Sequence, residues 1–299
     1  MAELKTYRDL PSENLITGGH SLCAGCGPAI GLRLSLLALG KNTIVINSAG
    51  CLTLTPTFPY TPYKVPWVFL AIENGAAAGI GIRSALKALK KDKGTNILAY
   101  IGDGATYDIG FQSLSHLLER NDNVIYVCYN NQNFSNTGHQ TSTATSKKMM
   151  TNTSPAGNPM WRKPITRIMA AHGVSYAATA SVGYPLDYMN KLLKIKDKPG
   201  AKFIDLHCPC QPGWGYDSSK TAEVARLAVQ TGAWPLYEFV NGKFSLTYKP
   251  DKLKPVKEYI KMQKRFSHLK EKDIKEIQGW ITKEWEQLSK GNFWEAKEY

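Results

Sequence analysis

NILAYIGDGATYDIGFQSLSHLLER, residues 96–120, joins an apolar run to a helix-like run through a short glycine-rich turn. Residues 96–101 are mostly apolar, which is typical of a buried strand. Residues 108–120 repeat apolar side chains at helical spacing. A strand that leads directly into a helix is the unit from which parallel sheets are built, so this stretch predicts an α/β fold.

The same alternation continues on both sides of this stretch. Other short apolar or β-branched runs are predicted to be strands, at 42–47, 65–72, 123–129, 174–182 and 202–207. Further helix-like runs lie at 28–39, 76–91, 164–172 and 185–195. Near-continuous apolar strands that alternate with helices predict an open, mostly parallel sheet with helices on both faces.

Two regions depart from this alternation. Residues 130–163 are polar and rich in Asn, Thr, Ser and Gly, which indicates a functional loop. After residue 215 the alternation fades, and residues 254–289 carry apolar side chains at loosely helical spacing. We therefore expect an α/β domain at residues 1–215 and a mainly helical C-terminal extension at residues 216–299.

Composition excludes several classes of protein. The 299 residues are 43% hydrophobic, enough for a substantial core, and no apolar run is long enough to span a membrane. The formal net charge is +13, but no helix or loop concentrates the basic residues, so nucleic acid is not an expected partner. We find no secretion signal and expect a cytoplasmic protein.

The Gly102-Asp103-Gly104 turn places a carboxylate and two glycines at the end of a predicted strand. Alone it is weak evidence, since tight turns favour these residues. The next predicted strand, 123–129, however, leads into Asn130 and Asn131, and Asn131 lies 28 positions after Asp103. A GDG followed by one strand–helix unit and then Asn resembles the diphosphate–Mg²⁺ motif of thiamine-diphosphate enzymes, with Mg²⁺ bound by Asp103, the Asn131 side chain and the Asn133 carbonyl.

A second glycine-rich stretch, GAAAGIG at 75–81, could be mistaken for a dinucleotide-binding motif. It lacks the GxGxxG order and a following acidic residue. Close packing of a helix through small residues is the better interpretation.

Six cysteines in a chain without a secretion signal indicate metal or redox chemistry more than disulfides. Cys23 and Cys26 form a CxxC, which can bind a metal or form a redox disulfide. Zinc would need two further ligands, which are absent nearby. Cys51 and the Cys208–Cys210 pair both follow predicted strands and could join the CxxC in a [4Fe–4S] site. Cys128, inside a strand, is expected in the core, and chemistry alone does not choose between Cys208 and Cys210.

Taken together, these motifs resemble the β subunit of the pyruvate (2-oxoacid):ferredoxin oxidoreductases, also called pyruvate synthases. The matching segments are GGHSLCAGCGPAIGLRL (18–34), INSAGC (46–51), IENGAAAGIGI (72–82), IGDGATYDIGFQSL (101–114), NFSNTGHQTSTAT (133–145), AAHGVSYAATASVGYP (170–185) and CPCQPGW (208–214). The resemblance covers residues 18–215 in family order and implies the thiamine-diphosphate-binding fold.

The resemblance also implies roles for individual residues. The [4Fe–4S] ligands correspond to Cys23, Cys26, Cys51 and Cys210. The cofactor contacts correspond to Pro28, Cys51, Gly102, Asp103, Gly104, Ala105, Asn131, Gln132, Asn133, Phe134, Ser135 and Asn136. Asn136 corresponds to the family's substrate-facing, catalytic Asn. Thiamine diphosphate and Mg²⁺ would serve oxidative decarboxylation of a 2-oxoacid, with electrons passing through the cluster to ferredoxin.

The family also implies partners. Other subunits of a hetero-oligomer complete the active site, because the carboxylate that activates thiamine lies on a partner chain. Acidic ferredoxins would suit the positive charge of this chain. Coenzyme A is a further candidate partner, as the acyl acceptor.

One departure from the family concerns the substrate. Family members that use pyruvate commonly carry acidic and tyrosyl residues where this chain has Asn130, Gln132 and Phe134. Amides in place of carboxylates would tolerate more negative charge, so we hypothesise a substrate such as oxalate beside pyruvate.

Two other functions fit parts of the sequence. A subunit that carries only the cluster, for electron transfer or as a scaffold, would have lost the thiamine site. The CxxC and the net charge would also fit a zinc-stabilised nucleic-acid binder.

Overall fold

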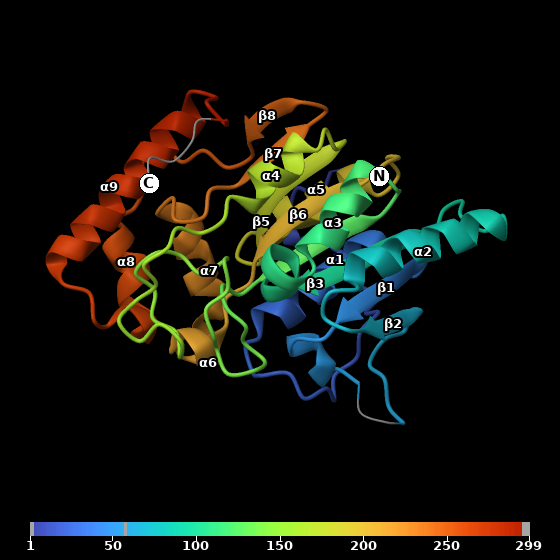
Figure 1. Cartoon of the computed structure of the whole chain (residues 1–299), viewed down its shortest axis with the longest axis horizontal. Coiled ribbons are helices and arrows are strands. Elements are labelled where there is room, and N and C mark those ends of the chain that lie inside the picture. Colours follow the sequence, from blue (N-terminus) through green and yellow to red (C-terminus); the bar gives the residue numbers. More distant parts are fainter. Residues whose placement is uncertain (1–2, 57–58, 295–299) are drawn as a thin grey trace.

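The apolar runs form the strands of one sheet (Figure 1). The computed structural model describes residues 3–56 and 59–294, and within them an eight-stranded sheet has the order β2-β1-β3-β4-β6-β5-β7-β8. The strands are β1 (Thr43–Ser48), β2 (Trp67–Leu70), β3 (Asn96–Gly102), β4 (Ile125–Asn130), β5 (Tyr176–Ser181), β6 (Lys202–His207), β7 (Tyr237–Val240) and β8 (Lys243–Leu246). The six predicted strands lie within about two residues of β1–β6.

Strands β1 to β6 are parallel to one another, whereas β7 pairs antiparallel with β5 and with β8 at one edge. The register aligns Gly102 at the end of β3 with Tyr129 in β4, and Asn130 with His207 in β6. The carboxyl ends of the central strands therefore meet at one edge. The predicted fold class, an open and mostly parallel α/β sheet, is confirmed.

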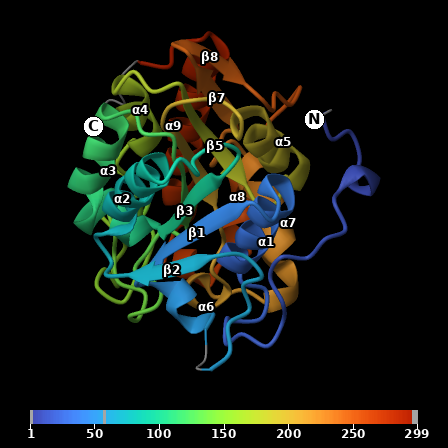
Figure 2. The same cartoon turned by 90° about the vertical axis from the view of Figure 1, so that its right-hand side faces the viewer.

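Helices cover both faces of this sheet (Figures 1 and 2). They are α1 (Gly27–Leu39), α2 (Gly75–Ala88), α3 (Phe111–Glu119), α4 (Ile165–Ala171), α5 (Pro185–Ile195), α6 (Gln211–Trp214), α7 (Thr221–Gln230), α8 (Val256–Lys261) and α9 (Glu271–Ser289). Alternate residues of β3 belong to different cores: Leu98 and Tyr100 pack on the α1 and α5 side, and Ala99 and Ile101 on the α2 and α3 side. Within the described residues, no helix combines the length and the apolar character that a membrane span requires.

The glycine-rich stretch 75–81 lies in α2 and packs closely on the sheet. A Cβ at Gly75 would lie 2.5 Å from Ile101 Cδ1, and one at Gly79 would lie 3.2 Å from Val124 Cγ1. These contacts leave no room for larger side chains on this face of the helix. The interpretation of this stretch as a packing surface is confirmed.

The C-terminal segment 216–299 supplies α7, α8 and α9, and also the hairpin of β7 and β8. We expected this segment to be mainly helical. Each strand of the hairpin has only four residues, too few for a period-2 pattern to be recognised. The division at residue 215 stays a prediction, and the outermost residues 1–2 and 295–299 lie outside the described part of the chain.

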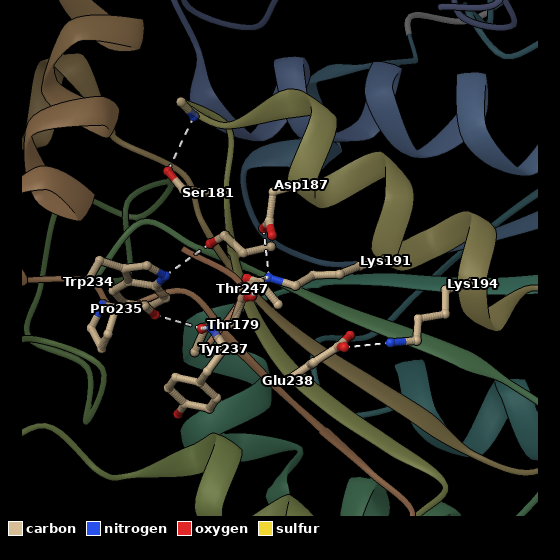
Figure 3. A network of polar contacts seen from close by, with 12 residues as sticks. Thr179, Ser181, Asp187, Lys191, Lys194, Trp234, Pro235, Tyr237, Glu238 and Thr247 are labelled. Atoms are coloured by element: carbon tan, nitrogen blue, oxygen red, sulfur yellow. Dashed lines mark hydrogen bonds and ion pairs between the residues drawn. The ribbon is translucent and has the colours of Figure 1, made fainter. Parts of the chain in front are cut away.

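Polar contacts join this hairpin to α5 and β5 (Figure 3). Thr179 in β5 donates to the Pro235 carbonyl at 2.7 Å and accepts from the Tyr237 N–H at 3.1 Å. The buried Lys191 of α5 donates to Thr247 at 2.8 Å and to Asp187 at 2.6 Å. These hydrogen bonds attach the C-terminal segment to the edge of the parallel sheet and to the helix that covers it.

Candidate functional site

The polar residues singled out in the sequence gather at the carboxyl edge of the parallel strands. Cys51 begins η2 (Cys51–Leu54), a short 3₁₀ turn after β1. Asp103 follows β3, Asn131 follows β4, and Cys210 precedes α6 after β6. This edge is where open α/β sheets bind ligands, because loops rather than helices cover it.

The two glycines of the GDG turn allow this turn to lie close to the aromatic side chains of Tyr129 and Phe134. A Cβ at Gly102 would lie 3.0 Å from the Tyr129 hydroxyl, and one at Gly104 would overlap the Phe134 ring. After Asp103 the chain enters η3 (Gly104–Ile109), a π-helical turn that buries Ala105 and leads into α3. The turn that carries Asp103 therefore packs directly against the end of β4 and the segment that follows it.

Asp103 is a buried carboxylate, 1% exposed. Ser142 donates to its Oδ2 at 2.7 Å, and the Asn131 N–H donates to its Oδ1 at 3.4 Å. Burial raises the pKa of Asp103 to about 8, although these hydrogen bonds act in the opposite direction. A buried carboxylate without a cationic partner in contact is unfavourable, and a bound cation would relieve that cost.

The side-chain amide of Asn131 can take two orientations. In one, its oxygen lies 2.8 Å from Asp103 Oδ1 and 2.8 Å from the Asn133 backbone oxygen, and its nitrogen faces Cys51 Sγ at 3.7 Å. In the other, the nitrogen occupies the first position and donates hydrogen bonds to both oxygens. The second is favoured by its contacts, because it replaces contacts between acceptors by hydrogen bonds. The first brings together three oxygens of the kind that bind Mg²⁺.

The rest of the segment after β4 folds tightly around these atoms. Gln132 has a positive φ of 63° and its carbonyl accepts from Thr145 at 2.7 Å. Ser135 donates to the Asn133 side chain. Phe134 pairs with Gln140 as an isolated bridge, and Asn136 is exposed. The structure therefore brings Asn131 and Asn133 to Asp103, whereas Asn136 lies on the exposed part of the segment.

The CxxC loop lies against the loop of Cys210. The Gly27 N–H donates to the Pro209 carbonyl at 3.2 Å, and Cys26 is the N-cap of α1. Burial raises the pKa of Cys26 to about 12, and the neighbouring Cys210 and Cys23 thiols add to the effect. Burial likewise raises the pKa of Cys51, with Cys210 and Cys26 contributing. The four sulfurs are thus near enough to one another for their thiolate forms to repel.

The spacing of these thiols bears on the kind of metal site. Among the side chains at 3–56 and 59–294, no three His, Cys, Asp or Glu lie close enough to hold a single metal ion. In a [4Fe–4S] cluster each thiolate binds a different iron, so the sulfurs are further apart than around one zinc ion. Four cysteine thiols, those of Cys23, Cys26, Cys51 and Cys210, are a donor set of the kind that holds such a cluster.

The other sequence-predicted residues occupy less direct positions. Pro28 lies in the first turn of α1, where its carbonyl accepts from the Tyr100 hydroxyl at 2.8 Å. Cys128 and Cys208 are both fully buried in the hydrophobic cores. Cys210, in contrast, is only partly buried and lies beside Cys26 and Cys51.

Several polar residues around the site were not predicted from the sequence. Ser142 contacts Asp103, and Trp214 Nε1 donates to the Asn131 carbonyl at 2.9 Å. The Arg265 guanidinium stacks on the Trp214 ring, 3.5 Å from its centroid. Asn130, expected near the substrate, is fully buried and donates to Asp205 Oδ1 at 3.0 Å. The Trp of the CPCQPGW motif was visible in the sequence, but its role was not.

Comparison with known proteins places this geometry in a family. Residues 40–206 match the family described as thiamine pyrophosphate enzyme, C-terminal TPP binding domain. The pyruvate synthase subunit PorB of Methanocaldococcus jannaschii is 49% identical over 91% of this chain and 95% of that protein. The PorB subunit of Methanothermobacter thermautotrophicus is 47% identical over 91% and 96%.

Two further relatives extend the comparison. The ketoisovalerate oxidoreductase subunit VorB of Pyrococcus abyssi is 40% identical over 96% of both chains. Among solved structures, a 2-oxoglutarate:ferredoxin oxidoreductase from Magnetococcus marinus aligns with a TM-score of 0.55 and 21% identity, over 73% of this chain and 79% of that one. At 21% identity, the structural match supports a shared fold and nothing further.

Proposed function

This chain belongs to the β-subunit family of the pyruvate (2-oxoacid):ferredoxin oxidoreductases, and we propose that it binds thiamine diphosphate with Mg²⁺ and a [4Fe–4S] cluster at the carboxyl edge of its sheet. As a member of that family it is an oxidoreductase subunit that works with other subunits. Its proposed reaction is the oxidative decarboxylation of a small 2-oxoacid.

One observation carries the cofactor proposal: a single atom of the Asn131 side-chain amide lies 2.8 Å from Asp103 Oδ1 and 2.8 Å from the Asn133 carbonyl oxygen. This donor set suits Mg²⁺, which would bind the diphosphate through its remaining positions. The same observation disfavours a subunit that carries only a cluster, because such a subunit would have no use for a buried carboxylate among oxygen ligands.

The residues of this chain would position the cofactor and separate it from water. Thiamine diphosphate, when bound, supplies the electron sink that makes the bond to the carboxylate of a 2-oxoacid cleavable. Trp214 and Ser142 fix Asn131 and Asp103 through hydrogen bonds, so the metal ligands are held in place before the cofactor binds. Gly102, Gly104 and Ala105 allow the backbone to approach the diphosphate.

The proposed cluster ligands are Cys23, Cys26, Cys51 and Cys210. The support is their mutual proximity and the contact of the Asn131 amide with Cys51. Cys51 would then border both the cluster and the thiamine site. Short separation between two redox centres favours electron transfer without a mobile carrier.

The substrate is proposed from the relatives and from the departure at residues 130–134. The relatives are named for pyruvate and for ketoisovalerate. Asn130 is hydrogen-bonded to Asp205 and is fully buried, so its amide would affect a substrate only through the local field. Where family members that use pyruvate commonly have acidic residues, this chain has the amides Asn130 and Gln132. A substrate with two negative charges would meet less electrostatic repulsion there, and we propose oxalate beside pyruvate as a substrate.

The partners follow from the family. Ferredoxin is proposed as the electron acceptor, because a net charge of +13 complements an acidic protein. Coenzyme A is proposed as the acyl acceptor when the substrate is pyruvate. Asn136, on the exposed part of its segment, is proposed to face the substrate, and Pro28 to contact the cofactor once the partner subunit closes the site.

The cofactor proposal is tested with the assembled complex and the substitution Asp103→Asn. We expect calorimetry to find no binding of Mg-thiamine diphosphate, and no reduction of viologen dye with pyruvate, oxalate, 2-oxoglutarate or 2-oxoisovalerate, with or without coenzyme A. Glu119→Gln, an exposed carboxylate at the end of α3, is the matched control and should leave both signals intact. Equal binding by the two variants would contradict the proposal.

The cluster proposal is tested separately with Cys210→Ser. We expect loss of iron and of the broad visible absorbance, while Cys208→Ala, two positions away in the core, retains both. If Cys208→Ala loses the iron and Cys210→Ser keeps it, the assignment of the fourth ligand is wrong. For the substrate, turnover of pyruvate much faster than oxalate by the wild-type complex would refute the oxalate hypothesis.

A further inference from the structure

A cavity of about 280 Å³ lies beside Gln132, and no cysteine is among the residues that line it. Its walls come from residues 146–162, from α8 and from α9, and Gln132 reaches it from the segment after β4. The volume is just below the roughly 300–1,000 Å³ typical of ligand pockets. The cavity therefore suits a ligand smaller than a nucleotide or a coenzyme.

Two buried polar atoms among the lining residues have no hydrogen-bond partner. They are Gln132 Oε1, on a side chain only 3% exposed, and Arg162 Nη1. Leaving a buried donor or acceptor unpaired costs about 1–3 kcal/mol, so such atoms are rare in folded proteins. One atom is an acceptor and the other a charged donor, so a ligand that satisfies both needs a donor and an anionic acceptor.

The charge of the lining favours an anion. It contains three cationic side chains, Lys147, Arg162 and Lys283, and one anionic side chain, Glu284. Burial acts to lower the pKa of Arg162, but Tyr107, Asp205 and Glu284 outweigh it and raise the pKa. Arg162 thus keeps its charge at the wall of the cavity.

The remaining walls are apolar and partly aromatic. Trp161 and Trp280 meet edge to face with ring centroids 4.6 Å apart, and the Lys147 ammonium lies 4.6 Å from the Trp161 centroid. Ile260, Ile277 and Ile281 complete the apolar surface. A flat or branched hydrocarbon body would bury its surface there.

From these features we propose that the cavity is a binding site for a small carboxylic acid with an aromatic or branched body and a hydroxyl or amino group beside the carboxylate. The carboxylate pairs with Arg162 Nη1, the adjacent O–H or N–H donates to Gln132 Oε1, and the body lies against the tryptophans and isoleucines. The cavity adjoins the proposed cofactor site through Gln132, but none of its other lining residues is a proposed cofactor contact.

The test is calorimetric titration of the assembled complex, without thiamine diphosphate, with three probes. L-Phenyllactate carries both the carboxylate and the hydroxyl, 3-phenylpropionate lacks the hydroxyl, and phenyllactamide lacks the charge. We expect phenyllactate to bind, and each of the other two to bind roughly tenfold more weakly or worse. 3-Phenylpropionate leaves Gln132 Oε1 without a donor, and phenyllactamide replaces the charge-assisted hydrogen bond to Arg162 by a weaker neutral one.

A cavity-filling substitution locates the binding. Ile281→Trp should abolish phenyllactate binding, whereas Lys275→Trp, on the exposed side of α9, should not. Both variants should retain thiamine-diphosphate binding, which separates this test from that of the proposed function. No phenyllactate binding at millimolar concentration, equal affinity for the three probes, or full binding by Ile281→Trp would each overturn the proposal.

Discussion

Gly104→Ala is a sharp test of how the GDG turn works, because the structure identifies what the added methyl group would meet. A Cβ at Gly104 would overlap the Phe134 ring, with its Cζ atom at 2.9 Å. The φ of Gly104 is not in the left-handed region, so the backbone itself would accept alanine. The expected effect is therefore steric and is directed at the segment that holds Asn133.

The magnitude follows from the way the clash is relieved. Phe134 is fixed by backbone hydrogen bonds with Gln140 and His139, both at 2.9 Å, so displacing its ring moves the Asn133 carbonyl as well. Overpacking of this kind costs about 1–3 kcal/mol. If this free energy destabilises the cofactor-bound protein and not the free protein, the dissociation constant of Mg-thiamine diphosphate rises roughly 5- to 150-fold. Each 1.4 kcal/mol changes a dissociation constant about tenfold.

The assay is calorimetric titration of the assembled complex with Mg-thiamine diphosphate, with circular dichroism to confirm folding. Phe134→Ala removes the ring, so adding Gly104→Ala in that background should weaken binding no further. The coupling energy between the two substitutions should then be about 1–3 kcal/mol. Gly81→Ala in α2 is the matched control, because no atom lies within 4 Å of its Cβ and affinity should not change.

Two results would refute this reasoning. Wild-type affinity in Gly104→Ala would mean that the Phe134 segment yields without moving the metal ligands. An equal loss of affinity in the wild-type and Phe134→Ala backgrounds would mean that the methyl group obstructs the diphosphate itself.

Three further predictions concern buried polar groups. Burial lowers the pKa of Lys202 from 10.5 to about 7, so the folded chain loses stability as pH falls from about 10.5 to 7. Lys202→Met should raise the free energy of unfolding at pH 7 by up to about 4 kcal/mol and flatten its pH dependence, and an unchanged pH profile in urea denaturation would contradict this. Trp214→Phe removes the hydrogen bond to the Asn131 carbonyl and should weaken cofactor binding about tenfold in the same titration; unchanged affinity would make the bond irrelevant. Lys191→Met leaves Asp187 without its cationic partner and should lower the free energy of unfolding by about 3–5 kcal/mol, whereas a loss near zero would show that the ion pair is dispensable.

The central strands and the site edge could be predicted because their signals are local. The apolar runs mark β1 to β6, and the residues directly after a parallel strand must lie at its carboxyl edge. This rule is enough to predict that Asp103, Asn131 and Cys51 lie at the same edge of the sheet. The four-residue strands β7 and β8 lack such a signal, because so short a run has no measurable period.

The supporting contacts of the site could not be predicted from pattern alone. Ser142 is 39 residues from Asp103, Trp214 is 83 from Asn131, and Tyr107 is 98 from Asp205. None of these pairs shares a helix or neighbouring strands in a known register. Such contacts depend on how loops cross the sheet edge, and hydrophobic periodicity carries no information about loops.

The hydrogen bonds of the Asn131 amide have a consequence for metal affinity. The amide nitrogen donates to Asp103 Oδ1 and to the Asn133 carbonyl oxygen, both at 2.8 Å. A Mg²⁺ ion that takes the amide oxygen as a ligand must break both hydrogen bonds and turn the amide by a half-rotation. Part of the free energy of metal binding is used for this exchange, so the ion binds less tightly than it would to three oxygens that already face one another.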